Sequence, residues 1–171
     1  MRQTALIVED DPGTRLVLSS TLATAGIDCI YAETGAAMWR QLNEKPDVII
    51  LDLSLPDADG LELLRQLRQN SEIPVLLHST RSDEVERIIG IEIGADDFLP
   101  KPCNMRELLA RTRSLLRRAQ RATLRRMFAF RLKEKRRLAP DIDAAFGTKG
   151  FVDFGDFGGR RDRIPDDPAA N

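Results

Sequence analysis

The chain has 171 residues, with 26 Lys and Arg against 27 Asp and Glu, a length that allows one ordinary domain with an extension. The near-zero net charge hides an asymmetry: residues 1–110 carry 10 basic and 19 acidic side chains, whereas residues 111–137 carry 12 basic and one acidic. No stretch approaches the ~18 apolar residues of a transmembrane helix, and two cysteines and one histidine are too few for a disulfide framework or a zinc site. We therefore expect a cytoplasmic protein without a membrane partner.

Short apolar runs alternate with amphipathic stretches between residues 4 and 102, and this pattern predicts strands that alternate with helices. The expected strands lie at 4–8, 28–32, 48–51, 75–78 and 97–99. The expected helices lie at 14–25, 36–42, 60–69, 83–93 and from Asn104 onward. Strict alternation with short connections implies an α/β fold, a doubly wound (βα)5 domain whose five-stranded parallel sheet has helices on both faces.

The last expected helix can continue beyond this domain as a long basic helix. We expect Pro140 to end it, because proline lacks the amide hydrogen that an interior helical position donates. The residues that follow are rich in Asp, Gly and Phe without periodicity, and such a composition predicts an irregular or disordered tail. The expected divisions are a domain at 1–118, a basic helical extension at 119–139 and the tail at 140–171.

Polar side chains follow several of the predicted strands at the point where each strand ends. Glu9 and Asp10 follow the first strand, and Asp52 follows the third. These strands are neighbours in the flavodoxin-like strand order, so their carboxylates meet at one edge of the sheet. Clustered carboxylates repel one another unless a cation joins them, and hard oxygen ligands suit Mg²⁺. Ser79 and Lys101, after the fourth and fifth strands, bring a hydroxyl and an ammonium group to the same edge.

This set of groups suits the transfer of a phosphoryl group to a carboxylate. Asp52 would be the nucleophile, and Mg²⁺ would neutralise charge on the carboxylate and the incoming group. Lys101 would contact one phosphoryl oxygen as a point charge, and Ser79 would donate a hydrogen bond to another. An aspartate at a strand end is often only a turn or cap residue, and only the combination favours the chemical role. Asp11 is expected to cap the first helix or to orient Lys101.

Several motifs together resemble the receiver domain of two-component response regulators, in particular the OmpR/PhoB type, over residues 4–118. They are Leu6-Ile7-Val8-Glu9-Asp10-Asp11, Ile50-Leu51-Asp52-Leu53-Ser54-Leu55-Pro56, Asp59-Gly60, Pro74-Val75-Leu76-Leu77-His78-Ser79, Gly94-Ala95-Asp96-Asp97-Phe98 and Lys101-Pro102. The resemblance implies that Asp52 is the phosphoacceptor. It also implies that Glu9 and Asp10 bind the metal and that the backbone carbonyl of Ser54 is a further ligand.

The resemblance further implies a switch and its partners. Ser79 is the switch hydroxyl, Phe98 the switch aromatic and Lys101 the phosphate contact, and the Lys101–Pro102 peptide is cis. A sensor histidine kinase would phosphorylate Asp52 and so alter the face formed by the fourth helix, fifth strand and fifth helix. When phosphorylated, the family forms homodimers on this face through charged residues that here correspond to Arg87, Asp96, Asp97, Glu107 and Arg111.

The region after Arg118 does not decide whether the protein acts by binding DNA or by contact with other proteins. A winged-helix DNA-binding domain follows the receiver in the OmpR/PhoB type, and the 53 residues here are short for one. Residues 128–138 faintly resemble its first strands, and residues 146–159 show no recognition-helix pattern, so one hypothesis is truncation or a frameshift. The positive charge can be a footprint for nucleic acid or a solvated helix face. The first interpretation is a phosphorylatable switch that controls dimerisation and transcription, and the short tail argues against DNA as a partner. The alternative is a stand-alone receiver without DNA binding that acts by protein contact or as a phosphate sink.

The sequence predicts a signalling switch whose only chemistry is its own phosphorylation and dephosphorylation, and not an enzyme. A haloacid-dehalogenase-type phosphatase also forms an aspartyl phosphate, but it needs Asp-x-Asp directly after the first strand. Here Glu9 takes the place of that nucleophile. We assign no catalytic role to His78, which we expect to be a satisfied or partly exposed histidine, or to Cys103, which we expect to be a small hydrophobe.

Overall fold

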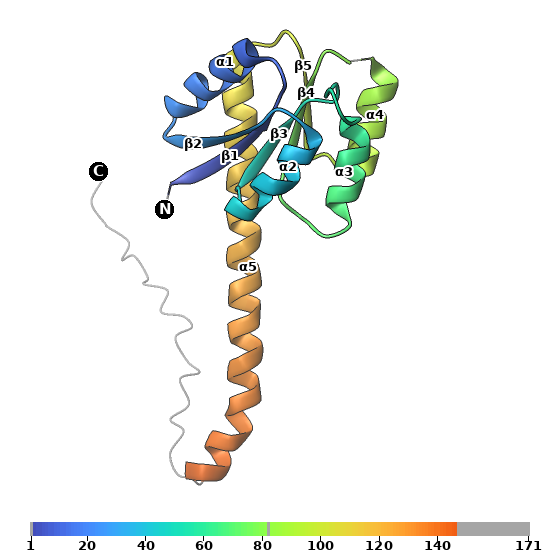
Figure 1. Ribbon diagram of the computed structural model, residues 1–171. Helices are drawn as coiled ribbons and strands as arrows, with labels where there is room; N and C mark the ends of the chain where they lie inside the picture. Colours follow the sequence, from blue (N-terminus) through green and yellow to red (C-terminus); the bar gives the residue numbers. More distant parts are fainter. Residues whose placement is uncertain (1, 82, 147–171) are drawn as a thin grey trace, which may run out of the picture. The chain divides into compact units, whose positions relative to one another are not determined.

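The computed structural model of the chain describes residues 2–81 and 83–146, and it describes side chains as far as Glu134 (Figure 1). The strands are β1 (Gln3–Val8), β2 (Ile27–Ala32), β3 (Val48–Leu51), β4 (Val75–Ser79) and β5 (Asp97–Pro100). The helices are α1 (Pro12–Ala23), α2 (Gly35–Gln41), the 3₁₀ turn η1 (Leu42–Glu44), α3 (Gly60–Arg68), α4 (Glu84–Ile93) and α5 (Met105–Phe146). The chain forms two compact units, residues 1–128 and 129–171, each described by itself.

The five strands form one parallel sheet in the order β2-β1-β3-β4-β5 (Figure 1). This is the predicted (βα)5 architecture, and each strand lies within one residue of its predicted bounds. β1 and β3 are neighbours as expected, with Val8 opposite Leu51. Glu9 and Asp52, the residues directly after these two strands, therefore have neighbouring positions at the carboxyl edge of the sheet.

Alternate residues of β1 point to opposite faces of the sheet and enter two separate cores. Leu6 and Val8 pack in a core with α2 and α3, whose buried residues include Met38 and Leu64. Ala5 and Ile7 pack in the second core, whose helical residues come from α1 and α5 and include Leu18, Leu22, Leu108, Leu115 and Leu116. Because β3 is buried on both faces, its four residues are all apolar, as in the central strand of a parallel sheet.

Side chains that accept hydrogen bonds from the first turn define where the helices begin. Asp11 accepts from the Thr14 amide at 2.6 Å and caps α1, which confirms one of its two predicted roles. The helix begins two residues earlier than predicted, because Pro12 has the fixed φ that suits the first helical position. Thr34 caps α2 in the same way, because its side chain accepts from the Ala37 amide at 3.0 Å.

Helix α4 packs closely on the sheet through a glycine. A Cβ atom at Gly90 would lie 2.6 Å from Cδ1 of Leu77, so the absence of a side chain permits the close approach. The large apolar residues of this helix lie instead toward solvent, with Val85, Ile88 and Ile91 exposed by 64%, 47% and 47%. A helix that would ordinarily bury such residues thus presents them on the surface.

The predicted end of the last helix at Pro140 is wrong, because α5 continues to Phe146. The φ angle of proline lies in the helical range, so a helix can continue past it at the cost of one backbone hydrogen bond that water can replace. Residues 140–146, the first part of the tail predicted at 140–171, are therefore helical, and the rest of that tail lies outside the described residues. Within the residues that the structure describes, no helix combines the length and apolar content needed to cross a membrane.

Candidate functional site

Three carboxylates converge at the carboxyl edge of the sheet. One carboxylate oxygen from each of Glu9, Asp10 and Asp52 lies within 4.8 Å of the others. Glu9 and Asp52 are buried, with 3% and 6% exposure, whereas Asp10 is open to solvent. The predicted grouping is therefore present, and its oxygen donors are of the kind that bind a hard divalent cation.

Lys101 joins two of these carboxylates. Its Nζ donates to Oε2 of Glu9 at 2.5 Å and to Oδ2 of Asp52 at 2.6 Å. The lysine follows β5, and its amide donates to the carbonyl of Ser79 at 2.9 Å, which ties it to the end of β4. The peptide between Lys101 and Pro102 is cis, as the resemblance implied.

Burial and pairing act against each other on the pKa values of these groups. Burial, together with the charge of Asp52, raises the pKa of Glu9, and this outweighs the opposing effect of Lys101. Burial alone would lower the pKa of Lys101, but its hydrogen bonds to Asp52 and Glu9 reverse the direction and raise it. The lysine is thus held as a cation beside a carboxyl group that gains a proton more readily than usual.

Asp52 is also contacted by the loop that follows it. The Ser54 amide donates to Oδ1 of Asp52 at 3.2 Å, while the role of the Ser54 carbonyl as a metal ligand stays a prediction. A Cβ atom at Gly60 would lie 2.5 Å from the carbonyl oxygen of Asp52 and 2.6 Å from Cα of Leu53. Gly60 has no role predicted from the sequence, where its one signal is its position after Asp59, which caps α3.

The two residues predicted to act as a switch are both buried. Ser79 is completely buried at the end of β4, and its Oγ accepts from the Arg81 amide at 3.2 Å. The Arg81 guanidinium in turn pairs with Asp59 at 3.0 Å and donates from Nε to Glu86 at 2.7 Å. Phe98 is 7% exposed and belongs to the core on the α2 and α3 face.

Comparison with known proteins agrees with this arrangement, because residues 5–113 match the response regulator receiver domain family. The chain belongs to this family. The transcriptional regulatory protein CpxR of Escherichia coli strain K12 is 40% identical over 114 residues, which cover 67% of this chain and 49% of that protein. The KDP operon transcriptional regulatory protein KdpE of the same strain is 46% identical over 114 residues, 66% of this chain and 51% of that protein.

Solved structures agree with the receiver fold. The receiver domain of TorR, the response regulator of the TMAO respiratory system, gives a TM-score of 0.65 at 39% identity and covers 68% of this chain and 98% of that one. The chain is thus close to transcriptional regulators of the OmpR/PhoB type, as the motifs indicated. It spans about half the length of the curated relatives it matches.

A histidine of this receiver domain lies inside β4 next to the site. His78 is 3% exposed, its Nε2 lies 3.4 Å from Sγ of Cys103, and its Nδ1 has no partner among the described residues. Burial and then the charge of Lys101 lower the pKa of His78 to about 4. The expectation of a satisfied or partly exposed histidine is therefore wrong, because Cys103 can engage only one ring nitrogen. A pocket of about 560 Å³ borders the pair and also reaches Val17 and Leu18 of α1.

Four of the five charged residues assigned to a dimer face lie together. Arg111 donates to Asp97 at 2.8 Å and to Glu107 at 2.7 and 2.9 Å, and Arg87 borders the same groove as Arg111. The fifth residue, Asp96, accepts from the Val75 amide at 2.8 Å and from Arg68 at 2.9 Å. Its place in the dimer face stays a prediction.

Proposed function

We propose that this receiver accepts a phosphoryl group on Asp52 from the phosphohistidine of a sensor histidine kinase. The observation that carries the proposal is the position of Lys101, whose Nζ lies within 2.6 Å of both Glu9 and Asp52 beside the open Asp10 carboxylate. A buried nucleophile, a cation and a cluster of metal-binding oxygens thus share one edge of the sheet. Packing of the core does not explain why charged groups of both signs are buried together at this edge.

The proposed metal is Mg²⁺, held by Glu9, Asp10 and Asp52 with the backbone carbonyl of Ser54. When bound, it would neutralise the carboxylates and the negative charge that builds up on the phosphoryl oxygens in transfer. The raised pKa of Glu9, which results first from burial and also from the charge of Asp52, supports a cation here. We therefore expect metal binding to weaken as the pH falls and Glu9 takes up a proton.

The proposed transfer is a displacement in which Asp52 forms an O–P bond as the P–N bond to the kinase histidine breaks. The imidazole nitrogen keeps the electron pair of the broken bond. Lys101, freed from Asp52, would then contact a phosphoryl oxygen, and the Ser79 hydroxyl would donate to another. Hydrolysis of the product would be the only other chemistry, so the protein acts as a switch and not as an enzyme with a separate substrate.

The proposed output is homodimerisation through α4, β5 and α5 and, through it, control of transcription. The exposed apolar residues Val85, Ile88 and Ile91 and the adjacent ion pairs of Arg111 support such a face. The relatives are transcriptional regulators by name, and DNA binding by this chain is a proposal from them. Output by protein contact alone is a second candidate, because the described residues supply the receiver and helix α5 and no winged helix.

Acetyl phosphate tests the central claim without the cognate kinase. With Mg²⁺ present, we expect a mass gain of one phosphoryl group that alkali removes. The gain should disappear when Mg²⁺ is omitted and in the Asp52→Asn variant. Asp28→Asn, which removes an exposed carboxylate on β2, is the matched control and should be labelled normally. A label that persists in Asp52→Asn would refute the assignment of the acceptor.

A further inference from the structure

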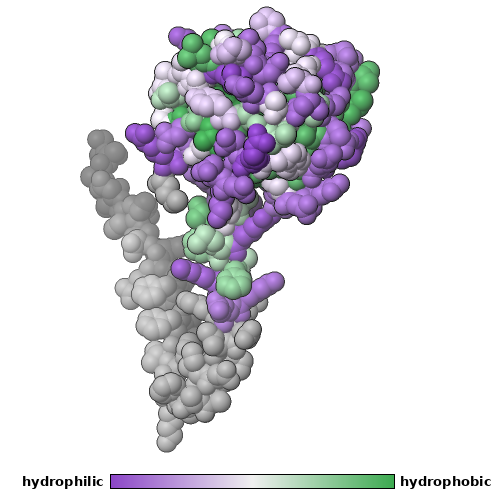
Figure 2. All heavy atoms as spheres, in the orientation of Figure 1, coloured by the Kyte–Doolittle hydropathy of each residue, from purple (hydrophilic) through white to green (hydrophobic). Residues whose placement is uncertain are grey.

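Helix α5 carries large apolar side chains that the receiver core does not bury. Within the unit formed by residues 1–128, the first half of the helix inserts Leu108, Leu115 and Leu116 into the core. Later in the same unit, Leu124, Met127 and Phe128 are exposed by 52%, 53% and 64%. Figure 2 shows hydrophobic surface on this part of the helix between strongly hydrophilic side chains.

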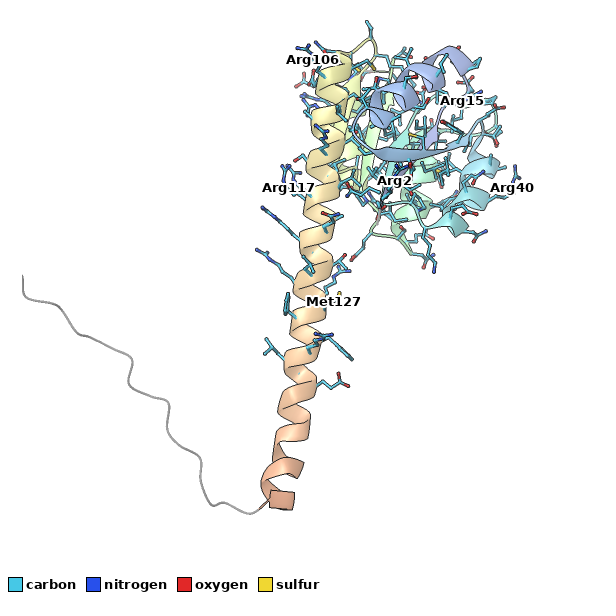
Figure 3. All side chains as sticks on the ribbon, turned by 90° about the vertical axis from the view of Figure 1, so that its left-hand side faces the viewer. Arg2, Arg15, Arg40, Arg106, Arg117 and Met127 are labelled. Atoms are coloured by element: carbon cyan, nitrogen blue, oxygen red, sulfur yellow. The ribbon has the colours of Figure 1, made fainter. Side chains whose placement is uncertain are left out.

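The same part of α5 has a strong positive charge. Seven arginines and no acidic residue occur between 111 and 128. Arg111 pairs with Asp97 and Glu107, and Arg126 pairs with Glu72. The other five have no ion pair among the described residues and are exposed; Figure 3 shows Arg117 extending from the helix into solvent. They are Arg113, Arg117, Arg118, Arg121 and Arg125.

The second unit repeats this combination by itself. In its described side chains, Phe130 and Leu132 are exposed by 66% and 62% and alternate with the exposed Arg131 and Lys133. Exposed aromatic and aliphatic residues are costly in water, and five within nine positions are more than isolated surface residues would explain. A partner that is both apolar and negatively charged would satisfy both kinds of side chain.

We propose that the segment from Arg117 to Phe128 of α5 binds to the surface of an anionic phospholipid bilayer. In such a bilayer the apolar side chains would enter the boundary between headgroups and acyl chains, while the guanidinium groups contact the phosphates. An arginine side chain can extend along apolar surface and keep its charge at the headgroups. The apolar and basic side chains therefore need not lie on separate faces of the helix. The expectation of no membrane partner considered only a spanning helix, and a helix that lies on the surface does not need that length.

Two other partners fit the segment less well. A second copy of the helix would bring two strongly positive segments together, and like charges on adjacent helices repel. Nucleic acid would satisfy the arginines through its phosphates, but backbone contacts would leave Leu124, Met127 and Phe128 in water. Charge complementarity together with apolar burial therefore favours the lipid surface.

Helix α4 offers an internal comparison. It also exposes apolar residues, Val85, Ile88 and Ile91, but its acidic residues outnumber its one basic residue, Arg87, so that the helix has a net negative charge. An anionic surface would repel this helix. Exposed apolar area without net positive charge should therefore not produce lipid binding.

Co-sedimentation of the full chain with vesicles tests the proposal. We expect binding to vesicles of equal parts phosphatidylglycerol and phosphatidylcholine and none to pure phosphatidylcholine. Changing Leu124, Met127 and Phe128 together to Ser should weaken binding at least about tenfold. Each of Arg117→Gln, Arg121→Gln and Arg125→Gln should cost about fivefold. The matched control, with Leu16 and Val17 of α1 changed to Ser, removes exposed apolar side chains outside both α5 and the proposed dimer face, and should bind like the wild type.

Three results would overturn the proposal. The first is the absence of binding to the anionic vesicles. The second is binding that the triple Ser change leaves intact and that duplex DNA displaces, which would identify the segment as a nucleic-acid contact. The third is a dimer in sedimentation velocity that the triple Ser change on α5 abolishes, which would identify a second copy as the partner. Phosphorylation of each variant by acetyl phosphate shows that its receiver unit is folded.

Discussion

At the scale of single residues, Lys101 determines the electrostatics of the site. Its Nζ contacts Glu9 and Asp52 at once, and these carboxylates are almost completely buried. Two buried carboxylates without a cation would repel each other, and one of them would take up a proton. The lysine therefore stabilises the ionised form of the pair, and it is a cation that a metal ion and a phosphoryl group can displace toward a new partner.

His78 leads to a prediction about the pH dependence of stability. Its pKa in the folded state is about 4, below the ordinary value of 6.5, so between these values the unfolded chain binds more protons than the folded one. Stability that is fully present above pH 6.5 is therefore lost as the pH falls toward 4. His78→Leu should abolish this part of the loss, which amounts to ~2 kcal/mol at pH 5.

Urea unfolding at pH 7.5 and pH 5 measures the effect. The free energy of unfolding of His78→Leu, relative to that of the wild type, should be larger at pH 5 than at pH 7.5, because the variant does not lose this part of its stability in acid. Cys103→Ala removes the contact to Nε2 but retains the titrating ring, and serves as the control. An equal difference between His78→Leu and wild type at both pH values would contradict the prediction.

At the scale of elements, the start of α3 is pressed against the end of β3. Gly60 begins the helix where its Cα faces the backbone of Asp52 and Leu53, so a side chain there would meet main-chain atoms that cannot rotate away. At Gly90 the nearest atom is the end of the Leu77 side chain, which can change rotamer. The two glycines allow similar close approaches of helix to sheet, but only Gly60 lies against Asp52, the proposed phosphoacceptor.

Gly60→Ala should therefore be much more harmful than Gly90→Ala. We expect Gly60→Ala to reduce the free energy of unfolding by about 3 kcal/mol and to slow labelling of Asp52, because the carbonyl of that residue must shift. Gly90→Ala should cost less, since a better helix former partly offsets the contact with Leu77. Denaturant unfolding and acetyl phosphate labelling measure both effects, and equal losses in the two variants would be evidence against this explanation.

At the scale of the whole molecule, the receiver has an apolar surface on α4 next to a group of charged residues. Ile88 and Ile91 border a groove of about 360 Å³ with Arg87, Asp97 and Arg111. The charged residues are already paired within the chain, so isolated surface ion pairs would add little to association. The apolar residues of α4 therefore provide most of the free energy of the proposed dimer.

Activation with beryllofluoride and Mg²⁺ should produce a dimer that Ile88→Glu weakens at least about tenfold, because a charge would be buried at the interface. Leu16→Glu on α1 is the matched control, since Leu16 is 67% exposed and lies on a helix of the opposite face of the sheet. Sedimentation velocity measures the association. A dimer equally sensitive to both variants would place the interface elsewhere.

Much of this protein could be predicted from its sequence. Runs such as residues 48–51 indicate buried parallel strands, and the alternation of strands with helices determines that the residues after them meet at one edge. The predicted convergence of four side chains is therefore confirmed, because it follows from topology alone. They are Glu9, Asp10, Asp52 and Lys101. The caps at Asp11 and Thr34 were also predictable, since capping depends on residues three positions apart.

Other features depended on contacts between residues far apart in the chain. Three such features depend on how the helices pack on the sheet. They are the Nδ1 of His78 without a partner among the described residues, the pairing of Asp96 with Arg68 and the approach of Gly60 to Asp52. The exposure of Ile88 and Ile91 on α4 has the same origin, because Gly90 lies at the contact of this helix with the sheet. Local sequence patterns determined the elements and their order, whereas only the tertiary structure decided which side chains are buried and paired, because burial depends on distances that no local pattern contains.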